Sequence, residues 1–450
     1  MLAVLTNLSR DCALRIANRA SKKNGGPMEL ITLPNGLRIF LNPCDNLRSA
    51  IVGVWVLSGS RYENERNNGI SHFIEHIVFK GSKKRSGFEI AEGMDEIGAQ
   101  VNAYTTKQYT FFYVKALDYQ LLKGADILFD MITAPRLDKK DIETEKGVIL
   151  EEIAMCEDDP DDVCYEVNER GIFSGGTMAL DILGTRQTVS SFTAEDIREY
   201  MAEKYLPSRT VIGVSGSFSR EEILAKIREY FGSLAETTVG ESFYELPFNK
   251  GFYLKTMSTE QNHIMLSFPG VATDSEDLYP LHIVTHILGV GTSSMLNRRI
   301  REELGLVYSV DAWLGTYAGG GYWAVSMSLG DKGEEKAIRE AVKIISDFSG
   351  TVTQRQVDIA KEKVISGLIM AGENPQSRFS SNGRTQLLFS KFTTDDEIIN
   401  KIKAITLGRV RETAEKYLKL SLMSFTAVGK VKTEQEYKTI VESAINKEGI

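Results

Sequence analysis

Histidine and cysteine are the scarce residues of this 450-residue chain, which contains five of the former and four of the latter. The cysteines form no CxxC pair and are too few for a disulfide scaffold of this size, so we expect a reducing compartment. No apolar run approaches the roughly 20 residues that a membrane-spanning helix needs. A basic excess is also missing, because the net charge is −8, and this argues against a general nucleic-acid-binding protein. We therefore expect neither membrane insertion nor a nucleic-acid partner.

The composition is that of an ordinary globular protein, with 42% hydrophobic and 25% charged residues. These values exclude a disordered tail, a collagen-like rod and a coiled coil. The length is two to four times the roughly 100–200 residues of a typical domain. We therefore expect at least two packed units.

Residues 1–27 differ in charge from the rest of the chain. Their one acidic residue is Asp11, and their five basic residues are Arg10, Arg15, Arg19, Lys22 and Lys23. The segment thus carries +4 and the remainder −12. A basic, acid-poor start resembles an organellar transit peptide. The alternative is an extension without a role, because Met28 opens the first strand-like stretch.

Strand-like and helix-like patterns follow one another from residue 30 onward. Strands are expected at 30–33, 37–42, 49–58, 100–104 and 109–116, and helices at 69–80, 88–97, 119–132 and 139–155. The order lacks the strict strand–helix alternation of a doubly wound fold. The sequence therefore predicts the α+β class.

The chain also contains an internal repeat. Residues 72–76 align with 282–286 at an offset of 210, and residues 141–160 align without gaps with 356–375 at an offset of 215. A glycine-containing, aromatic, β-rich stretch lies between the two segments in each copy. This order predicts two similar domains, each a mainly antiparallel sheet flanked by helices. We expect the domains at 28–236 and 249–450, joined by a linker at 237–248.

Two of the five histidines lie one helical turn apart, in the motif His72-Phe-Ile-Glu-His76. At roughly 100° per residue their side chains are about 40° apart around the helix. Two such imidazoles can bind one metal ion, and Glu75 beside them can hold a water molecule on it. This HxxEH order occurs in zinc peptidases. The alternative is a pair of structural histidines beside a solvated glutamate.

A catalytic zinc site needs a third protein ligand, which we expect from the helix at 139–155. Glu145 and Glu152 are seven residues apart, hence within about 20° of each other on this helix. They share an apolar stripe with Ile149, where a carboxylate is costly to bury unless a cation compensates it. We therefore predict Glu152 as the third ligand and Glu145 as an acid that orients a ligating histidine. The alternative is an ordinary charged helix.

The motif His72–His76, with Glu152 76 residues further on and Glu145 between them, resembles the pitrilysin/insulinase family of zinc peptidases. The two-domain members fit best, namely bacterial processing-protease-like proteins and the β subunit of mitochondrial processing peptidase. The resemblance implies one Zn²⁺ per chain and makes Glu75 the general base. It also implies that substrate peptides add as a β-strand along Asn102, Ala103 and Tyr104.

The resemblance further implies a role for the second domain. Arg301 and Tyr308 match a pair that contacts the substrate carbonyl near zinc in active family members, and such donors suit a developing oxyanion. In two-domain relatives the pair reaches the zinc across a dimer interface. We therefore expect a homodimer in which Arg301 and Tyr308 act in trans.

The second copy lacks the expected chemistry. Thr285 stands at the position of Glu75, and Gly367 at that of Glu152. His282 and His286 remain, and without a carboxylate nearby we expect them in a packed helix at 279–288 that binds no metal.

The sequence thus predicts a zinc metalloendopeptidase of short or unfolded polypeptides, located in the cytoplasm of a bacterium. One alternative is the catalytic subunit of a presequence-processing peptidase, in the mitochondrial matrix or a related organelle. The other is a non-catalytic assembly or binding subunit.

Overall fold

The structure is a computed structural model that describes residues 28–44, 46–236 and 243–445. The basic segment 1–27 and the first half of the predicted linker, 237–242, lie outside the described residues. In the described part, no helix is both long enough and apolar enough to cross a membrane.

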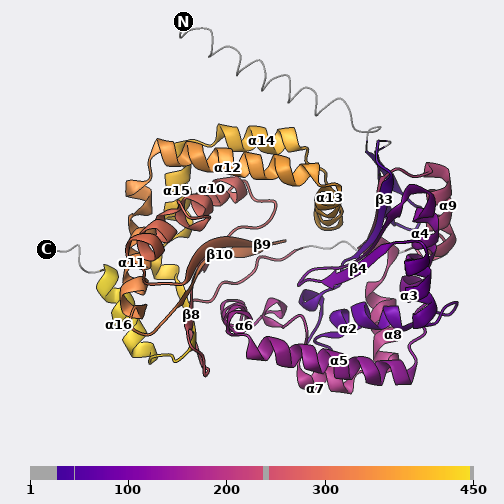
Figure 1. Cartoon of the computed structure of the whole chain (residues 1–450), viewed down its shortest axis with the longest axis horizontal. Helices are drawn as coiled ribbons and strands as arrows, with labels where there is room; N and C mark the ends of the chain where they lie inside the picture. The colour runs from indigo at the N-terminus through magenta and orange to yellow at the C-terminus, as the bar shows by residue number, and fades with distance from the viewer. Residues whose placement is uncertain (1–27, 45, 237–242, 446–450) are drawn as a thin grey trace, which may run out of the picture.

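The first half of the chain is built on a six-stranded sheet in the order β1-β2-β6-β3-β5-β4 (Figure 1). Neighbouring strands are antiparallel, except that β2 and β6 are parallel. The strands are β1 (Glu29–Thr32), β2 (Arg38–Pro43), β3 (Ser49–Val56), β4 (Gln100–Thr105), β5 (Thr110–Leu117) and β6 (Thr210–Gly216). Strand β3 is an almost continuous apolar run and is buried along nearly its whole length, as expected for a central strand. Strand β4 lies at the edge.

The described residues of this half also contain eight α-helices. They are α2 (Ile70–Ile77), α3 (Gly87–Glu96), α4 (Leu121–Thr133), α5 (Lys139–Asp158), α6 (Pro160–Ile172), α7 (Arg186–Ser191), α8 (Ala194–Lys204) and α9 (Arg220–Phe231). All nine elements predicted between residues 30 and 155 are present, with ends shifted by a few residues.

The second half repeats this plan with a five-stranded sheet in the order β7-β11-β8-β10-β9. Its strands are β7 (Phe252–Thr256), β8 (Asn262–Pro269), β9 (Ser309–Tyr317), β10 (Gly320–Leu329) and β11 (Ser424–Gly429). This order matches β2-β6-β3-β5-β4. Among the described strands each sheet has one parallel pair, β7 with β11 and β2 with β6, and it falls at the same place in both. The prediction of an α+β fold with two similar halves is therefore confirmed.

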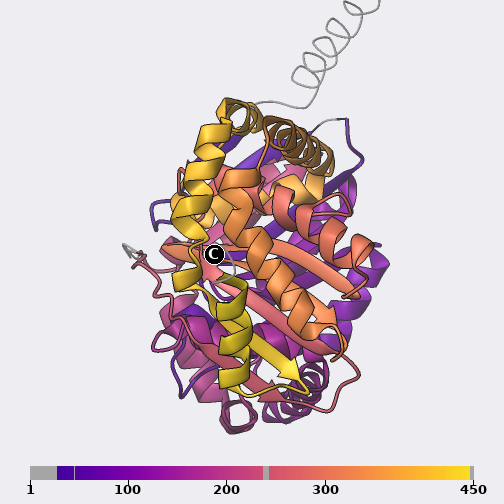
Figure 2. The same cartoon turned by 90° about the vertical axis from the view of Figure 1, so that its left-hand side faces the viewer.

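The helices of the second half form a layer on the outer side of its sheet, which faces the viewer in Figure 2. They are α10 (Leu278–Gly289), α11 (Glu334–Thr351), α12 (Gln354–Glu373), α13 (Pro375–Phe389), α14 (Asp395–Ala404), α15 (Leu407–Tyr417) and α16 (Glu434–Ile445). Helix α13 is the exception, because it leaves this layer and packs against the first sheet (Figure 1).

The two halves exchange one helix each. Helix α6 of the first half packs on β7, β8 and β11 of the second sheet, and α13 packs on β3 and β6 of the first. The ring of Phe379 from α13 fits over Gly53 and Gly213, where an added Cβ would lie 2.8–3.0 Å from it. The exchange buries apolar side chains of both halves in shared clusters and so holds the halves together.

The tips of two equivalent hairpins also meet at the junction. The Ala318 N–H of the β9–β10 tip donates to Gln108 Oε1 of the β4–β5 tip at 3.2 Å. Lys107 of the same tip forms an ion pair with Glu169 of α6 at 3.2 Å, and Tyr317 donates to that carboxylate at 2.8 Å. The edge strand β4 is therefore anchored to the second half at one end.

Candidate metal centre

Helix α2, which carries the HxxEH motif, begins on a buried carboxylate. Glu63 accepts hydrogen bonds from the backbone N–H groups of Gly69 at 2.7 Å and Ser71 at 2.9 Å, two of the N–H groups that a helix start leaves unpaired. Gly69 has a φ of 93°, and an added Cβ would lie 2.6 Å from the Leu183 carbonyl oxygen. This position therefore requires glycine, and together with Glu63 it fixes where the eight-residue helix starts.

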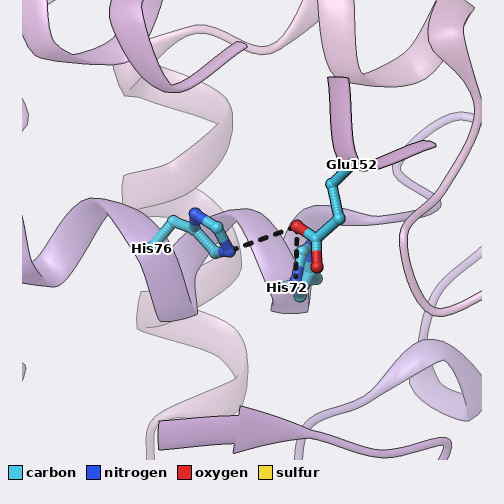
Figure 3. A group of neighbouring side chains, drawn as sticks. All are labelled: His72, His76 and Glu152. Atoms are coloured by element: carbon cyan, nitrogen blue, oxygen red, sulfur yellow. Dashed lines mark ion pairs between the residues drawn. The ribbon is translucent and has the colours of Figure 1, made fainter. Parts of the chain in front are cut away.

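Helices α2 and α5 bring His72, His76 and Glu152 together (Figure 3). Oε2 of Glu152 lies 3.7 Å from Nε2 of His72 and 3.6 Å from Nε2 of His76. One ligand atom from each residue lies within 4.8 Å of the other two. In the described part of the chain, this is the one such group of histidine, cysteine and acidic side chains that could hold a metal ion.

The spacing of these atoms fits a tetrahedral zinc site. With metal–ligand bonds of about 2.0–2.2 Å, ligand atoms of a tetrahedral site lie roughly 3.3–3.6 Å apart. The two observed distances of 3.6 and 3.7 Å are close to this range. Two imidazoles and one carboxylate are also the donor set of zinc sites that leave a fourth position open. The three residues therefore fit the predicted ion.

A second carboxylate orients His76. Oε2 of Glu145 lies 3.3 Å from Nδ1 of His76, and its other oxygen forms an ion pair of 2.7 Å with Lys80. Glu145 is only 1% exposed; burial raises its pKa, but the hydrogen bonds to His76 and Lys80 outweigh burial and hold the pKa below its ordinary value. An ionised carboxylate on Nδ1 keeps Nε2 directed toward Glu152.

The charge state of the histidines suits a cation. Burial, with a smaller contribution from His76, lowers the pKa of His72 to about 3, so that this ring is neutral at pH 7. Burial acts in the same direction on His76, but the hydrogen bond to Glu145 and the charge of Glu152 raise its pKa. Neutral imidazole is the metal-binding form, and a bound cation would displace the proton that the two carboxylates attract to His76.

The carboxylate of Glu75 is half-buried on the same helix and bonded to the edge strand. Oε2 accepts a hydrogen bond of 2.7 Å from the hydroxyl of Thr105, the last residue of β4. Burial raises the pKa of Glu75, and the bond from Thr105 counteracts part of this effect. Glu75 therefore lies beside the metal ligands and next to the strand predicted to bind substrate.

The predicted substrate residues Asn102, Ala103 and Tyr104 lie on β4, whose outer side has no neighbouring strand in the described sheet. Unpaired backbone groups of an edge strand can pair with an incoming peptide. A cavity of about 520 Å³ lies beyond Glu152 along α5, lined by Ile153 and Cys156 of that helix among others. This cavity therefore leaves open space beside the C-terminal turns of α5, beyond Glu152.

Arg301 and Tyr308 are not part of this group. Arg301 lies in a π-helical turn, Asn297–Glu303, and Tyr308 is 72% exposed just before β9. In the described residues neither side chain forms a hydrogen bond or ion pair with the three ligands. At about 3.3 Å per residue, Tyr308 lies roughly 30 Å along β9 from the hairpin tip at Ala318 that contacts the first half. Tyr308 is therefore at the end of β9 opposite to the hairpin tip that contacts the first half.

Three residues of the site were not predicted from the sequence: Glu63, Lys80 and Thr105. Glu63 lies in an irregular polar segment, and nothing in its spacing indicates that it contacts the start of α2. Lys80 follows His76 by four residues, so helical spacing offered a weak signal for it. Thr105 directly follows the predicted substrate residues, but its contact with Glu75 depends on how α2 packs against β4.

The corresponding position of the second half has no carboxylate. His282 and His286 lie on α10, and Thr285 between them accepts a hydrogen bond from Trp323 Nε1 at 3.0 Å and donates to the Leu281 carbonyl at 2.7 Å. Lys363 of α12 lies near enough to lower the pKa of His286, where burial is the larger cause. The charge that acts on His286 from α12 is thus positive, whereas a metal site would need an anion beside the histidines.

Comparison with known proteins assigns the chain to a family. Residues 41–186 match Insulinase (Peptidase family M16), and residues 191–364 match the Peptidase M16 inactive domain. The uncharacterized zinc protease YmxG of Bacillus subtilis (strain 168) is 35% identical over 384 residues, which cover 84% of this chain and 93% of that protein. The chain therefore belongs to the insulinase family of peptidases, as its motifs predicted.

Further relatives are similar over nearly the whole chain. The uncharacterized zinc protease SCO5738 of Streptomyces coelicolor is 30% identical over 431 residues, 91% of this chain and 91% of that protein. A protease from Helicobacter pylori has the same fold, with a TM-score of 0.83 and 19% identity over 90% of this chain and 99% of the other. The family and the zinc-protease relatives together indicate a zinc peptidase.

Proposed function

We propose that the protein is a zinc metalloendopeptidase that hydrolyses short or unfolded polypeptides. The observation that supports this best is the convergence of His72, His76 and Glu152 from two helices, with oxygen–nitrogen distances of 3.6 and 3.7 Å. Glu75, the predicted general base, lies on the same helix and holds a fixed hydrogen bond. Two zinc-protease relatives that match over most of their length support the same activity.

Each side chain of the site has its own role in peptide-bond hydrolysis. His72, His76 and Glu152 would hold the zinc ion, which lowers the pKa of a bound water molecule toward neutrality. Glu75 accepts the proton of the attacking water and passes it to the leaving amine. Glu145 keeps His76 oriented, and Arg301 and Tyr308 donate hydrogen bonds to the oxygen of the scissile carbonyl as charge develops on it.

Substrate peptides bind as an added strand along Asn102, Ala103 and Tyr104 of β4. The edge position of this strand, next to Glu75, supports this mode. Main-chain pairing recognises the backbone of the substrate peptide rather than its side chains. The peptidase therefore has a loose sequence preference and favours segments that are already extended over folded proteins.

Arg301 and Tyr308 act in trans within a homodimer. The exposure of Tyr308 and its distance of about 30 Å from the hairpin tip support a partner subunit as the place where it works. Each metal group then takes its oxyanion donors from the other copy, so a monomer has an incomplete site.

The bacterial type of the family is the better fit for this chain, because the two sequence relatives described above come from Bacillus subtilis and Streptomyces coelicolor. The location that we propose is the bacterial cytoplasm. The organellar alternative depends on residues 1–27 as a targeting segment, and cleavage by the chain with and without these residues, in the absence of any other subunit, distinguishes the two.

Hydrolysis of a quenched, unstructured peptide by the purified zinc-loaded chain tests the proposed function. We expect cleavage that stops on chelation and returns when zinc is added back, with one zinc ion per chain. Cleavage that is insensitive to chelation would contradict the proposal, as would a chain that binds its zinc and cleaves nothing under any condition.

Mixing two inactive variants tests the trans arrangement. Glu75→Gln lacks the base and Tyr308→Phe lacks the phenol donor, so each variant alone is expected to be nearly inactive. In an equimolar mixture that has exchanged subunits, about one quarter of the sites combine an intact base with an intact tyrosine from the partner. Recovery to about that level supports action in trans, whereas a mixture no more active than its components contradicts it.

A further inference from the structure

We propose that Thr105 is the positioning residue of the general base: its hydroxyl holds one oxygen of Glu75 so that the other faces the attacking water. The inference deepens the proposed function and rests on it. The carrying observation is the Thr105–Glu75 hydrogen bond of 2.7 Å between the end of β4 and α2.

The direction of this bond is set by chemistry. An ionised carboxylate can only accept, so the single hydroxyl proton of Thr105 points to Oε2 of Glu75. A charge-assisted bond of this kind is short and stronger than a neutral one. It fixes the rotation of the carboxylate group, which otherwise turns freely about its last side-chain bond. With Oε2 held, Oε1 is the oxygen that remains to take a proton.

The position of Thr105 is itself fixed by the neighbouring strand β5. Its register partner is Thr110 of β5, whose hydroxyl is fully buried and donates to the Ser58 carbonyl at 2.9 Å. Since the only proton of Thr110 is committed there, Thr110 can only accept across the 3.3 Å contact between the two hydroxyl oxygens. The Glu75 carboxylate, at 2.7 Å, is the closer acceptor for the Thr105 proton, and its charge makes it the stronger one.

The hairpin turn beyond Thr105 is held as well. The Thr106 N–H donates to the Tyr109 carbonyl at 2.8 Å, and the Thr106 hydroxyl bonds the same carbonyl at 3.0 Å. Gln108 at the tip accepts from the Ala318 N–H of the second half. The second half therefore fixes, through this hairpin, the strand end that carries Thr105. A hydroxyl on so rigid a support can hold a catalytic group to the accuracy that proton transfer needs.

The repeat provides an internal comparison. Thr316 occupies the equivalent place in the β9–β10 hairpin, because it pairs with Gly321 as Thr105 pairs with Thr110, five residues on in each case. On the neighbouring helix Thr285 replaces Glu75 and is bonded to Trp323 and Leu281 instead. Thr316 thus has no base to orient, and its replacement serves as the matched control.

Three variants of the zinc-loaded full-length protein test the proposal: Thr105→Val, Thr105→Ser and Thr316→Val. Valine keeps the shape and the β-propensity of threonine but removes the hydroxyl. For Thr105→Val we expect kcat to fall about 10- to 100-fold, with KM changed less than about two-fold. Zinc stoichiometry and the zinc dissociation constant, measured by competition with a chelator, should equal those of the wild type. Thr105→Ser should restore kcat to within a few-fold of wild type.

The possible outcomes separate this inference from the proposed function. If the wild type cleaves peptides in a zinc-dependent way and Thr105→Val cleaves equally fast, the positioning role is wrong while the peptidase function stands. A serine variant as slow as the valine variant would also overturn the inference, because packing of the methyl group would then be the cause. The same holds if Thr105→Val loses zinc affinity, or if Thr316→Val slows cleavage as much as Thr105→Val does.

Discussion

The two halves of the molecule share a strand order, a hairpin and a 20-residue helix, α5 in the first and α12 in the second, yet within the described residues only the first brings together a group that could hold a metal ion. In the first, His72, Glu75 and His76 of α2 face Glu152 of α5. In the second, His282, Thr285 and His286 of α10 have no such partner, and the one side chain of α12 that affects their charge state is the cation Lys363. The fold therefore does not depend on the residues of the metal group, because Thr285 and Gly367 stand where the first half has Glu75 and Glu152.

The second half has a packing role instead. Its Thr285 hydroxyl accepts the indole N–H of Trp323, a ring that is fully buried in the core of that half. Its helix α13 covers the first sheet, and its hairpin tip holds the end of β4. The second half thus supports the sheet of the first half and the hairpin that carries the end of β4.

Removing the base from the first half is expected to have the largest effect. Glu75→Gln keeps the shape of the side chain but cannot accept a proton, so kcat should fall by about 10²- to 10⁴-fold while zinc content stays at one per chain. Thr285→Val, at the equivalent place in the second half, should leave kcat unchanged. Steady-state kinetics and metal analysis measure these two effects. A Glu75→Gln variant of undiminished activity would refute the assignment of Glu75 as the general base.

Loss of the third metal ligand, Glu152, is expected to have the second-largest effect. Glu152→Gln removes the anionic ligand, and we expect zinc affinity to fall at least as far as the 10- to 100-fold that follows loss of an outer carboxylate. The control is Glu151→Gln, because Glu151 is exposed and lies about 100° around the same helix from Glu152. If chelator competition gives equal zinc affinity for Glu152→Gln and wild type, Glu152 is not a ligand.

The converse experiment introduces a metal site into the second half. Gly367 takes the place of Glu152, and an added Cβ there has open space around it. Lys363 takes the place of Val148, so Gly367→Glu with Lys363→Val supplies the missing carboxylate and removes the opposing charge. We expect zinc stoichiometry to rise from one toward two per chain, with the new site weaker than the first because Glu145 has only Ala360 as its counterpart. A stoichiometry that stays at one would show that the two helix pairs differ in geometry as well as in side chains.

The smallest expected effect concerns the acid stability of the second half. Burial, with a smaller contribution from His286, lowers the pKa of His282 to about 4. The folded state thus keeps this ring neutral while the unfolded chain binds a proton below about pH 6.5, so stability is lost as the pH falls from 6.5 toward 4. For the metal-free protein, His282→Gln should reduce the loss between pH 6.5 and 5 by about 1–2 kcal/mol.

Urea unfolding of wild type and His282→Gln at the two pH values measures this difference. His72, whose pKa burial lowers to about 3, contributes a loss in the same direction to both proteins and cancels in the comparison. An identical pH dependence for the two proteins would mean that His282 is solvated enough to titrate normally in the folded state.

Local geometry explains which parts of the site could be predicted. The relative positions of His72, Glu75 and His76 follow from helical periodicity, as does the shared face of Glu145 and Glu152, so spacing alone identified them. The hairpin of β4 and β5 followed from a pattern of alternating aromatic residues, and the two similar halves from a nearly constant offset, whereas the substrate-binding role of β4 came from the family resemblance. Tertiary packing decides the remaining contacts, because each of them joins two separate segments. These contacts are Glu63 with the start of α2, Thr105 with Glu75, and the exchange of α6 and α13. No periodicity within either segment encodes them.

The most direct test of the central claim is anomalous diffraction at the zinc absorption edge from crystals of the zinc-loaded protein. We predict one strong peak per chain, about 2.0–2.2 Å from Nε2 of His72, Nε2 of His76 and a carboxylate oxygen of Glu152, and no peak at His282 and His286. A zinc ion bound elsewhere, or one bound to the two imidazoles with the Glu152 carboxylate beyond coordinating distance, would contradict the account.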